Sequence, residues 1–319
     1  MHSDGGSAER GVKMGKIAVV FSGQGAQYPG MGKSLYDCSA AARELYDYAE
    51  KFRPGTKKQS FEGTAEELSL TKNTQPCLYL VDLCAAAALE ERGIKADGVA
   101  GFSLGEIAAL AYSKAYSYEK GFEIVTKRAE LMQIAAGEND TAMAAVLKLD
   151  SKTVESLCDD IDGIYPVNYN SPVQTVVSGT KESIAEFKVK AAEKKARVID
   201  LAVSAAFHSP YMNNAAESFA EYLSGVKTNA LRVPVYANYT AKPYESDILP
   251  VLTKQMNNPV RWCDTINNMI ADGYTDFIEA GAGKTLCGLI KKISSDVRVY
   301  SVENEETLNQ TIEAVKANA

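Results

Sequence analysis

The sequence has few histidines and no excess of positive charge. Its 319 residues include two histidines, His2 and His208, and carry a formal net charge of −7. A net negative chain without a basic run or an aromatic–basic stripe is a poor match for a phosphate backbone, so we expect no nucleic-acid partner. The scarcity of histidine also limits the number of imidazole bases available for catalysis.

Long apolar runs are absent as well. The longest apolar stretch, around Leu78–Leu89, is interrupted by Asp82 and is too short to cross a membrane. The start of the chain shows no charged segment followed by an apolar one, so we expect a cytoplasmic protein without a membrane segment. The cysteines form no C-x-x-C pair and have no histidine at metal spacing, which favours reduced, mostly buried thiols and predicts no metal site. They are Cys38, Cys77, Cys84, Cys158, Cys263 and Cys287.

Composition and pattern predict a globular α/β protein. Residues 1–13 are polar, glycine-rich and non-periodic, which predicts a disordered leader or cloning residues before Met14 as a candidate natural start. Lys16–Phe21 and Asp97–Phe102 are predicted strands, buried on both faces because their hydrophobicity does not alternate. Strands alternating with longer helical patterns predict a parallel sheet with helices on both sides. Further strands are expected at Val233–Tyr239, Asp276–Ala280 and Val297–Val302, and helices at Gln75–Leu89 (with Pro76 in its first position), Leu104–Ser113 and Tyr118–Ala136.

The middle of the chain has a different pattern. Its predicted elements follow the order βαββαβ, which is the split unit of ferredoxin-like domains. We therefore expect a large α/β subdomain over 14–138 and 205–319, with a small α+β insert over 139–204. The insert's predicted elements are the strand Ala144–Leu149, the helix Ser151–Cys158, the strands Ile164–Asn168 and Thr175–Ser178, the helix Lys181–Lys194 and the strand Arg197–Leu201.

One glycine-rich turn carries a candidate nucleophile. Residues 101–105 (GFSLG) fit G-x-S-x-G between a predicted strand and a predicted helix, which would direct the Ser103 hydroxyl out of the carboxyl edge of the sheet. The N–H of Leu104, at the helix start, is free to donate to an oxyanion. Glu106 lies in the first helical turn, where a carboxylate suits the helix dipole, and we interpret it as structural. The pattern alone also fits an ordinary serine, because a hydroxyl needs a base to become nucleophilic.

His208 is the candidate base, since His2 falls in the predicted leader. It follows the insert in SAAFHSP (204–210), where small residues and Pro210 indicate a constrained loop. The residues alone leave a catalytic and a structural role equally open. A second glycine-rich turn, FSGQGAQYPGMG (21–32), fails the dinucleotide pattern at Tyr28 and lacks a P-loop lysine. Its alternative use is to present the N–H of Gln24 as a second oxyanion donor.

Several segments together resemble the malonyl-CoA:acyl carrier protein transacylases, relatives of the acyltransferase domains of fatty acid and polyketide synthases. The segments occur in family order and extend from Met14 to the last helix. The family's fold, a hydrolase-like α/β subdomain interrupted by a ferredoxin-like one, agrees with the division above. The segments are FSGQGAQYPGMG (21–32), NTQPCL (73–78), GFSLGEIAAL (101–110), KRAELMQ (127–133), AMAAVL (142–147), PVNYNSP (166–172), AFHSPYM (206–212), NNPVRW (257–262) and EAGAGKTLCGLIKKI (279–293).

The resemblance implies catalytic roles. Ser103 matches the family's acylated serine and His208 its base, a pair that works without an acidic third member. Gln255 matches the residue whose backbone carbonyl holds the imidazole; a carbonyl acceptor still fixes the tautomer with a proton on Nδ1. Gln24 and Leu104 match the residues whose N–H groups form the oxyanion hole.

The resemblance also implies substrate contacts. Arg128 matches the arginine that pairs with the malonyl carboxylate, and Arg197 a basic residue near the CoA phosphates. Gln75, Asn168 and Asn170 match pocket residues. From the residues alone, a solvated helix arginine, a helix N-cap for Gln75 and turn formers for the two asparagines remain open.

Two positions depart from the family's usual residues, and a third matches its malonyl-selective form. Phe102 stands where histidine is usual, which changes the rim of the acyl pocket, and Ser22 stands where proline is common. Phe207 matches the malonyl-selective form of the motif around His208, because its ring disfavours an added methyl group.

The implied reaction is a ping-pong transfer of a malonyl group from malonyl-CoA to acyl carrier protein, with no metal or other cofactor. The carrier is acidic while this chain is net negative, so its docking patch must be local, with Lys284, Lys291 and Lys292 as candidates. The oligomeric state is left open, a monomer included. The alternatives are a trans-acting acyltransferase of a polyketide synthase, a Ser–His acyl hydrolase and a non-catalytic scaffold.

Overall fold

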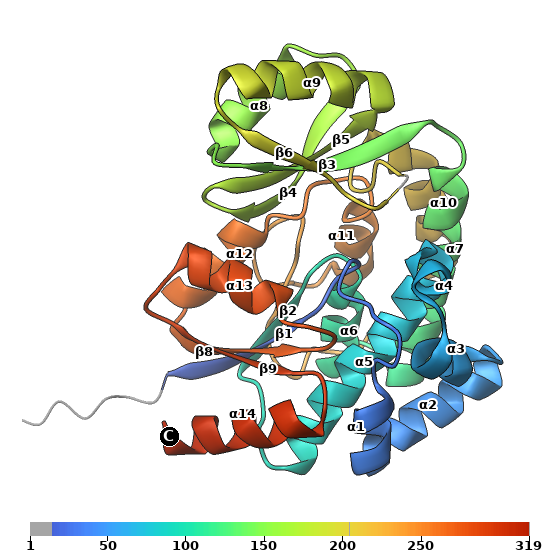
Figure 1. Cartoon of the computed structure of the whole chain (residues 1–319). Coiled ribbons are helices and arrows are strands. Elements are labelled where there is room, and N and C mark those ends of the chain that lie inside the picture. The colour runs from blue at the N-terminus through green and yellow to red at the C-terminus, as the bar shows by residue number, and fades with distance from the viewer. Residues whose placement is uncertain (1–14, 204, 319) are drawn as a thin grey trace, which may run out of the picture.

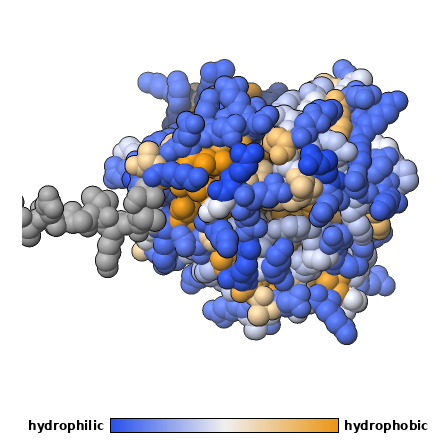
Figure 2. Space-filling model, turned by 90° about the horizontal axis from the view of Figure 1, so that it is seen from below, coloured by the Kyte–Doolittle hydropathy of each residue, from blue (hydrophilic) through white to orange (hydrophobic). Residues whose placement is uncertain are grey.

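The computed structural model describes residues 15–203 and 205–318, so the predicted leader over 1–13 lies outside the described residues. A large subdomain contains a parallel sheet, and a small subdomain with its own antiparallel sheet lies above it in Figure 1. The predicted α/β fold with an inserted ferredoxin-like unit is confirmed. Within the described ranges, no helix is long and apolar enough to span a membrane. The face shown in Figure 2 is mostly hydrophilic, with apolar residues in small groups.

The parallel sheet has the strand order β7-β2-β1-β8-β9. The central strand β1 (Lys16–Phe21) buries Val19 and Phe21 in one apolar cluster and Ala18 and Val20 in another, which explains its unbroken hydrophobicity. Helices α5 (Thr71–Glu91) and α6 (Gly105–Tyr112) contribute to the first cluster, and α12 (Trp262–Ala271) and α13 (Thr285–Ile293) contribute to the second, so helices cover both faces. The other strands are β2 (Gly98–Gly101), β7 (Val235–Tyr236), β8 (Tyr274–Ala280) and β9 (Arg298–Val302).

Strand β7 is much shorter than the predicted strand Val233–Tyr239. It pairs with β2 through only two residues, because the chain then turns back on itself. The N–H of Ala237 donates to the carbonyl of Lys242 at 2.9 Å, and the N–H of Tyr244 donates to that of Val235 at 2.8 Å. The turn withdraws residues 237–239 from the sheet and leaves them at its carboxyl edge.

Helix α5 (Thr71–Glu91) begins four residues before the predicted start, so Pro76 lies inside the helix and not in its first position. The proline costs the helix one backbone hydrogen bond, but eighteen of the residues of α5 are buried, and this packing outweighs the loss. The remaining helices of the large subdomain are α1 (Lys33–Cys38), α2 (Ala40–Phe52), α3 (Thr56–Glu62), α4 (Ala65–Ser69), α6 (Gly105–Tyr112), α7 (Tyr118–Ala136), the 3-10 helix η1 (Pro210–Met212), α10 (Asn213–Leu223), α11 (Ile248–Lys254), α12 (Trp262–Ala271), α13 (Thr285–Ile293) and α14 (Glu305–Ala317).

The small subdomain is an antiparallel sheet with the strand order β4-β5-β3-β6, covered on its outer face by two helices (Figure 1). Strand β4 is tied to the large subdomain: the N–H of Tyr169 donates to the carbonyl of Val260 at 2.9 Å, and the N–H of Val260 donates to that of Val167 at 2.8 Å. These bonds hold β4 over the carboxyl edge of the parallel sheet. The elements are β3 (Thr141–Leu147), α8 (Ser151–Asp159), β4 (Ile164–Ser171), β5 (Gln174–Thr180), α9 (Lys181–Glu193) and β6 (Arg197–Asp200).

Candidate active site

Ser103 occupies a sharp turn between β2 and α6. Its φ of 54° lies in the left-handed region, which is strained for a residue other than glycine and is typical of a nucleophile elbow. Gly105 permits the turn, because a Cβ at this position would lie 2.5 Å from the carbonyl oxygen of Phe21. The start of α6 therefore packs directly against the end of β1, and the serine hydroxyl lies at the carboxyl edge of the sheet.

The chain brings His208 to this serine. Nε2 of His208 lies 2.7 Å from Oγ of Ser103, and Nδ1 lies 2.8 Å from the backbone carbonyl oxygen of Gln255, at the end of α11. A carbonyl can only accept, so Nδ1 carries the proton and Nε2 is left to accept from the hydroxyl. Burial, together with the positive charge of Arg128, lowers the pKa of His208 from 6.5 to about 4. The imidazole is therefore neutral at neutral pH and able to accept a proton.

Arg128, on α7, is a wholly buried cation and not a solvated helix arginine. Nη1 donates to Oε1 of Gln75 at 2.7 Å, and Nη2 donates to Oε1 of Gln255 at 2.8 Å and to Oγ of Ser103 at 3.2 Å. Nε has no partner among the described residues, and Arg128 forms no salt bridge with them. Burial lowers its pKa to about 10, so the guanidinium remains charged at neutral pH. A buried charge with only neutral partners suits an incoming carboxylate.

The two predicted oxyanion donors lie in neighbouring turns. Across the described residues, the backbone N–H groups of Gln24 and Leu104 have no hydrogen-bond partner. The two turns touch: a Cβ on Gly23 would lie 2.8 Å from the carbonyl oxygen of Phe102. Two unpaired donors in adjoining turns beside a serine are the requirement for stabilising an oxyanion.

Asn238 braces the turn, and the sequence analysis did not identify it. Its Oδ1 accepts from the N–H of Ser103 at 2.7 Å, and its Nδ2 donates to the carbonyl oxygen of Gly101 at 2.6 Å. Asn238 follows β7 at the carboxyl edge of the sheet, and a polar residue in this position is a sequence signal for a site residue. The predicted strand Val233–Tyr239 included Asn238, so this residue was not recognised as lying after the end of the strand.

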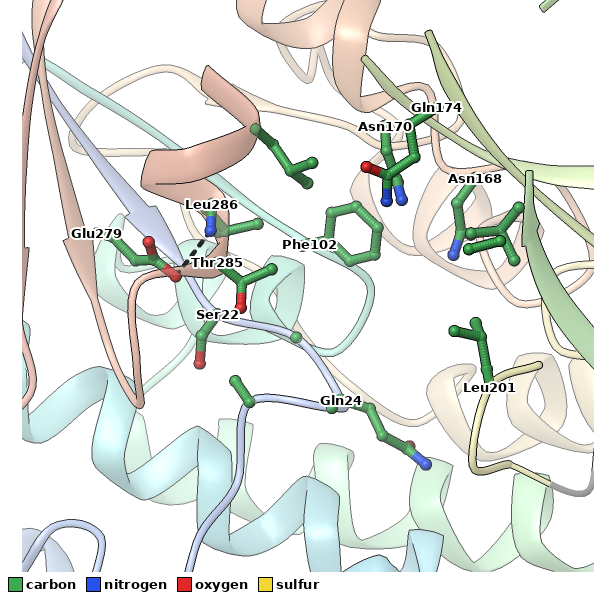
Figure 3. Close-up of a pocket in the computed structure, with 16 residues that line it drawn as sticks. Ser22, Gln24, Phe102, Asn168, Asn170, Gln174, Leu201, Glu279, Thr285 and Leu286 are labelled. Atoms are coloured by element: carbon green, nitrogen blue, oxygen red, sulfur yellow. Dashed lines mark hydrogen bonds between the residues drawn. The ribbon is translucent and has the colours of Figure 1, made fainter. Parts of the chain in front are cut away.

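A cavity of about 210 Å³ lies between the two subdomains, next to this turn. In Figure 3, Asn168, Asn170 and Gln174 of the small sheet face Phe102 of the large subdomain. Both asparagines lie in strand β4 and not in a turn, and Oδ1 of each is buried without a partner within the described residues. Phe102 rests against Trp262, with 5.5 Å between ring centroids. The cavity thus combines an aromatic wall with amide groups.

The remaining predicted residues do not line the cavity between the subdomains. Phe207 is buried and borders, with Gln24, a second cavity on the side of α7. Arg197 is exposed on β6 and does not line the cavity between the subdomains. Lys284 and Lys292 are exposed on or next to α13, whose residues 285, 286 and 289 line that cavity.

Lys292 lies near the cavity, with Nζ 3.5 Å from Oε1 of Gln174, whereas Lys291 donates to the carbonyl of Val297, beyond α13. In the part of the chain that the structure describes, no three acidic, histidine or cysteine side chains are grouped to hold a metal ion. The six cysteines are free.

Comparison with known proteins identifies relatives over nearly the whole chain. Residues 18–309 match the acyl transferase domain family. A malonyl CoA-acyl carrier protein transacylase of Bacillus subtilis is 39% identical over 312 residues, covering 95% of this chain and 98% of the relative. A crystal structure of the transacylase of the same name from Clostridium perfringens has a TM-score of 0.91 at 33% identity, covering 95% of this chain and 98% of the other. A malonyl-transacylase solved in complex with its type II polyketide acyl carrier protein has a TM-score of 0.90 at 31% identity, covering 94% and 99%.

Proposed function

The chain belongs to the malonyl CoA-acyl carrier protein transacylases of the acyl transferase family, and we propose that it moves a malonyl group from malonyl-CoA to the phosphopantetheine thiol of acyl carrier protein. One observation carries the choice of acyl group. The wholly buried guanidinium of Arg128 donates to the hydroxyl of Ser103 at 3.2 Å and has no acidic partner among the described residues. A lipase or esterase has no use for such a cation, whereas malonyl places a carboxylate two carbons from the carbon under attack.

The first half-reaction loads the enzyme. Nε2 of His208 takes the proton of the Ser103 hydroxyl as Oγ bonds to the thioester carbon. The N–H groups of Gln24 and Leu104 stabilise the oxyanion of the tetrahedral intermediate. The bond between carbon and sulfur then breaks, CoA leaves as a thiol with the proton from His208, and a malonyl-serine ester remains. Arg128 holds the malonyl carboxylate throughout.

The second half-reaction reverses these steps with another thiol. His208 takes the proton of the phosphopantetheine thiol, whose sulfur bonds to the ester carbon. The bond to Oγ of Ser103 breaks, and the proton returns to Oγ. No step requires a metal or a redox cofactor.

The cavity between the subdomains suits the arm that both thiols share. Phosphopantetheine alternates amide groups with methylene groups, and the cavity offers the amides of Asn168 and Asn170 opposite the ring of Phe102 (Figure 3). Lys284 and Lys292 lie at the α13 side of this cavity, where an acidic carrier would approach. Arg197 is proposed to meet CoA phosphates. We propose a cytoplasmic fatty acid carrier as acceptor; the relative solved with a polyketide carrier supports the alternative acceptor.

Intact-mass measurement tests the proposal. After mixing with malonyl-CoA, the protein should gain the mass of one malonyl group, Ser103→Ala should gain none, and acetyl- and methylmalonyl-CoA should load less. Transfer from the loaded protein to fatty acid and polyketide carriers would then identify the acceptor. An unloaded wild-type protein would support the scaffold alternative. Release to water without transfer to any carrier would support the hydrolase alternative.

A further inference from the structure

The mechanism above leaves one carboxyl group of the site unused. Glu106, in the first turn of α6, is wholly buried and not at an exposed helix start. Three donors surround it: the N–H of Asn238 at 3.1 Å and Nε2 of Gln255 at 3.0 Å meet Oε2, and the hydroxyl of Tyr244 meets Oε1. Its two oxygens therefore face different neighbours, and only Oε2 contacts a residue that touches Arg128.

The contact with Gln255 determines which way that amide points. Nε2 of Gln255 donates to Oε2 of Glu106 and, at 2.6 Å, to the carbonyl oxygen of Ser103, while its Oε1 accepts from Nη2 of Arg128 at 2.8 Å. The reversed amide would set its oxygen against two acceptors and its NH₂ against the guanidinium. Glu106 and the Ser103 carbonyl therefore fix the NH₂ group of the Gln255 amide, and this leaves the amide oxygen facing Arg128 as an acceptor.

We propose that Glu106 is a positioning residue for recognition of the acyl carboxylate: it holds the Gln255 amide in the orientation that aims Arg128 at the space beside Ser103. The inference rests on the proposed function. Glu106 meets neither the substrate nor the imidazole in this arrangement. His208 is held instead by the backbone carbonyl of Gln255, at the end of α11, which does not depend on the orientation of the Gln255 amide.

The positioning role depends on the hydrogen-bond geometry of Glu106 and not on its charge. Burial raises the pKa of Glu106 to about 7, with Arg128 and its three donors acting in the opposite direction. The ionisable groups that bear on it are Arg128, Tyr244 and Tyr116. A neutral side chain of the same shape can keep the geometry, because the Tyr244 hydroxyl can reverse and accept. Glu106→Gln therefore retains an acceptor for Gln255, and Glu106→Ala removes it.

The test compares acylation of Ser103 by malonyl-CoA and by acetyl-CoA, which lacks the carboxylate. In Glu106→Ala, kcat/KM for malonyl-CoA should fall about tenfold to a hundredfold, mainly through KM, because a hydrogen bond to a charged group is lost. The value for acetyl-CoA should stay within about threefold. Glu106→Gln should restore most of the preference for malonyl-CoA. Tyr244→Phe is the matched control: it removes the bond on the Oε1 side, so it should lower stability and leave the preference unchanged.

Equal losses for both acyl groups, or an unchanged preference in Glu106→Ala, would overturn the inference. If Glu106→Ala fails to fold, Glu106→Leu fills much of the same space without offering an acceptor to Gln255, and it should show the same selective loss. Absence of malonyl loading by the wild-type protein would instead reject the proposed function, so the two failures are distinguishable.

Discussion

Arg128 and His208 both contact the hydroxyl of Ser103. Nη2 of Arg128 lies 3.2 Å from Oγ and Nε2 of His208 lies 2.7 Å from the same atom, so a permanent cation and a neutral imidazole share one hydroxyl. The positive charge disfavours protonation of the imidazole, in addition to the effect of burial. The residue proposed to bind the substrate thus also influences the base.

Removing the charge of Arg128 should raise the pKa of His208 from about 4 toward 6.5. The base must be neutral to act, so the loss of activity at acid pH should begin at a higher pH in Arg128→Leu than in the wild-type protein. The pH dependence of kcat/KM for acetyl-CoA measures this ionisation in the free enzyme without requiring a carboxylate partner. Arg128→Lys is the control and should keep the wild-type profile, while identical profiles for all three would contradict the electrostatic coupling.

Asn238→Ala should destabilise the protein by about 2–4 kcal/mol and slow the acylation of Ser103. The substitution leaves the N–H of Ser103 and the carbonyl of Gly101 buried without partners. The substitution also removes a hydrogen bond that helps to hold Ser103 at its φ of 54°. Urea unfolding and the rate of malonyl loading measure the two effects. Asn229→Ala, at an exposed asparagine, is the control; equal effects of the two substitutions would contradict the role of Asn238.

Asp82 on α5 and Ser22, two residues before Gln24, form a buried pair in which the Ser22 hydroxyl donates to Oδ1 of Asp82 at 2.6 Å. Burial raises the pKa of Asp82 well above 3.8. The folded state therefore keeps a proton that the unfolded chain has released, so this contribution to stability falls as pH rises above about 4.

In Asp82→Asn this titration is absent. The free energy of unfolding of the wild-type protein minus that of the variant should therefore decrease from pH 4 to pH 8, as measured by urea unfolding at both pH values. A difference that does not change with pH would show that Asp82 is ionised in the folded state.

Phe207→Ala should increase loading by methylmalonyl-CoA relative to malonyl-CoA by about tenfold to a hundredfold, because we propose that the buried ring of Phe207, which borders a cavity together with Gln24, limits the space for an added methyl group. Intact mass after mixing the protein with both thioesters measures the ratio, and continued loading by malonyl-CoA controls for an intact site. An unchanged ratio would show that Phe207 does not determine the preference for malonyl-CoA over methylmalonyl-CoA.

Local signals predicted much of the fold. Helix α7 has the predicted bounds because Ser117 caps its start with its side chain and Gly137 follows its end. The start of α5 was missed because its N-cap, Leu70, makes no side-chain cap bond, so Pro76 suggested a later start. The length of β7 was missed because the turn that ends it depends on backbone bonds to Lys242 and Val235.

The sequence by itself determined the order of strands and helices, the inserted subdomain and the glycine turn at Ser103, since periodicity, turn residues and motifs act over a few positions. Only the tertiary structure decided that His208, 105 residues away, reaches that hydroxyl, that Arg128 is buried beside it and that Glu106 bonds to Gln255. These outcomes depend on which distant polar groups are buried together. A buried donor or acceptor needs a partner, and local sequence does not specify which partner the fold supplies.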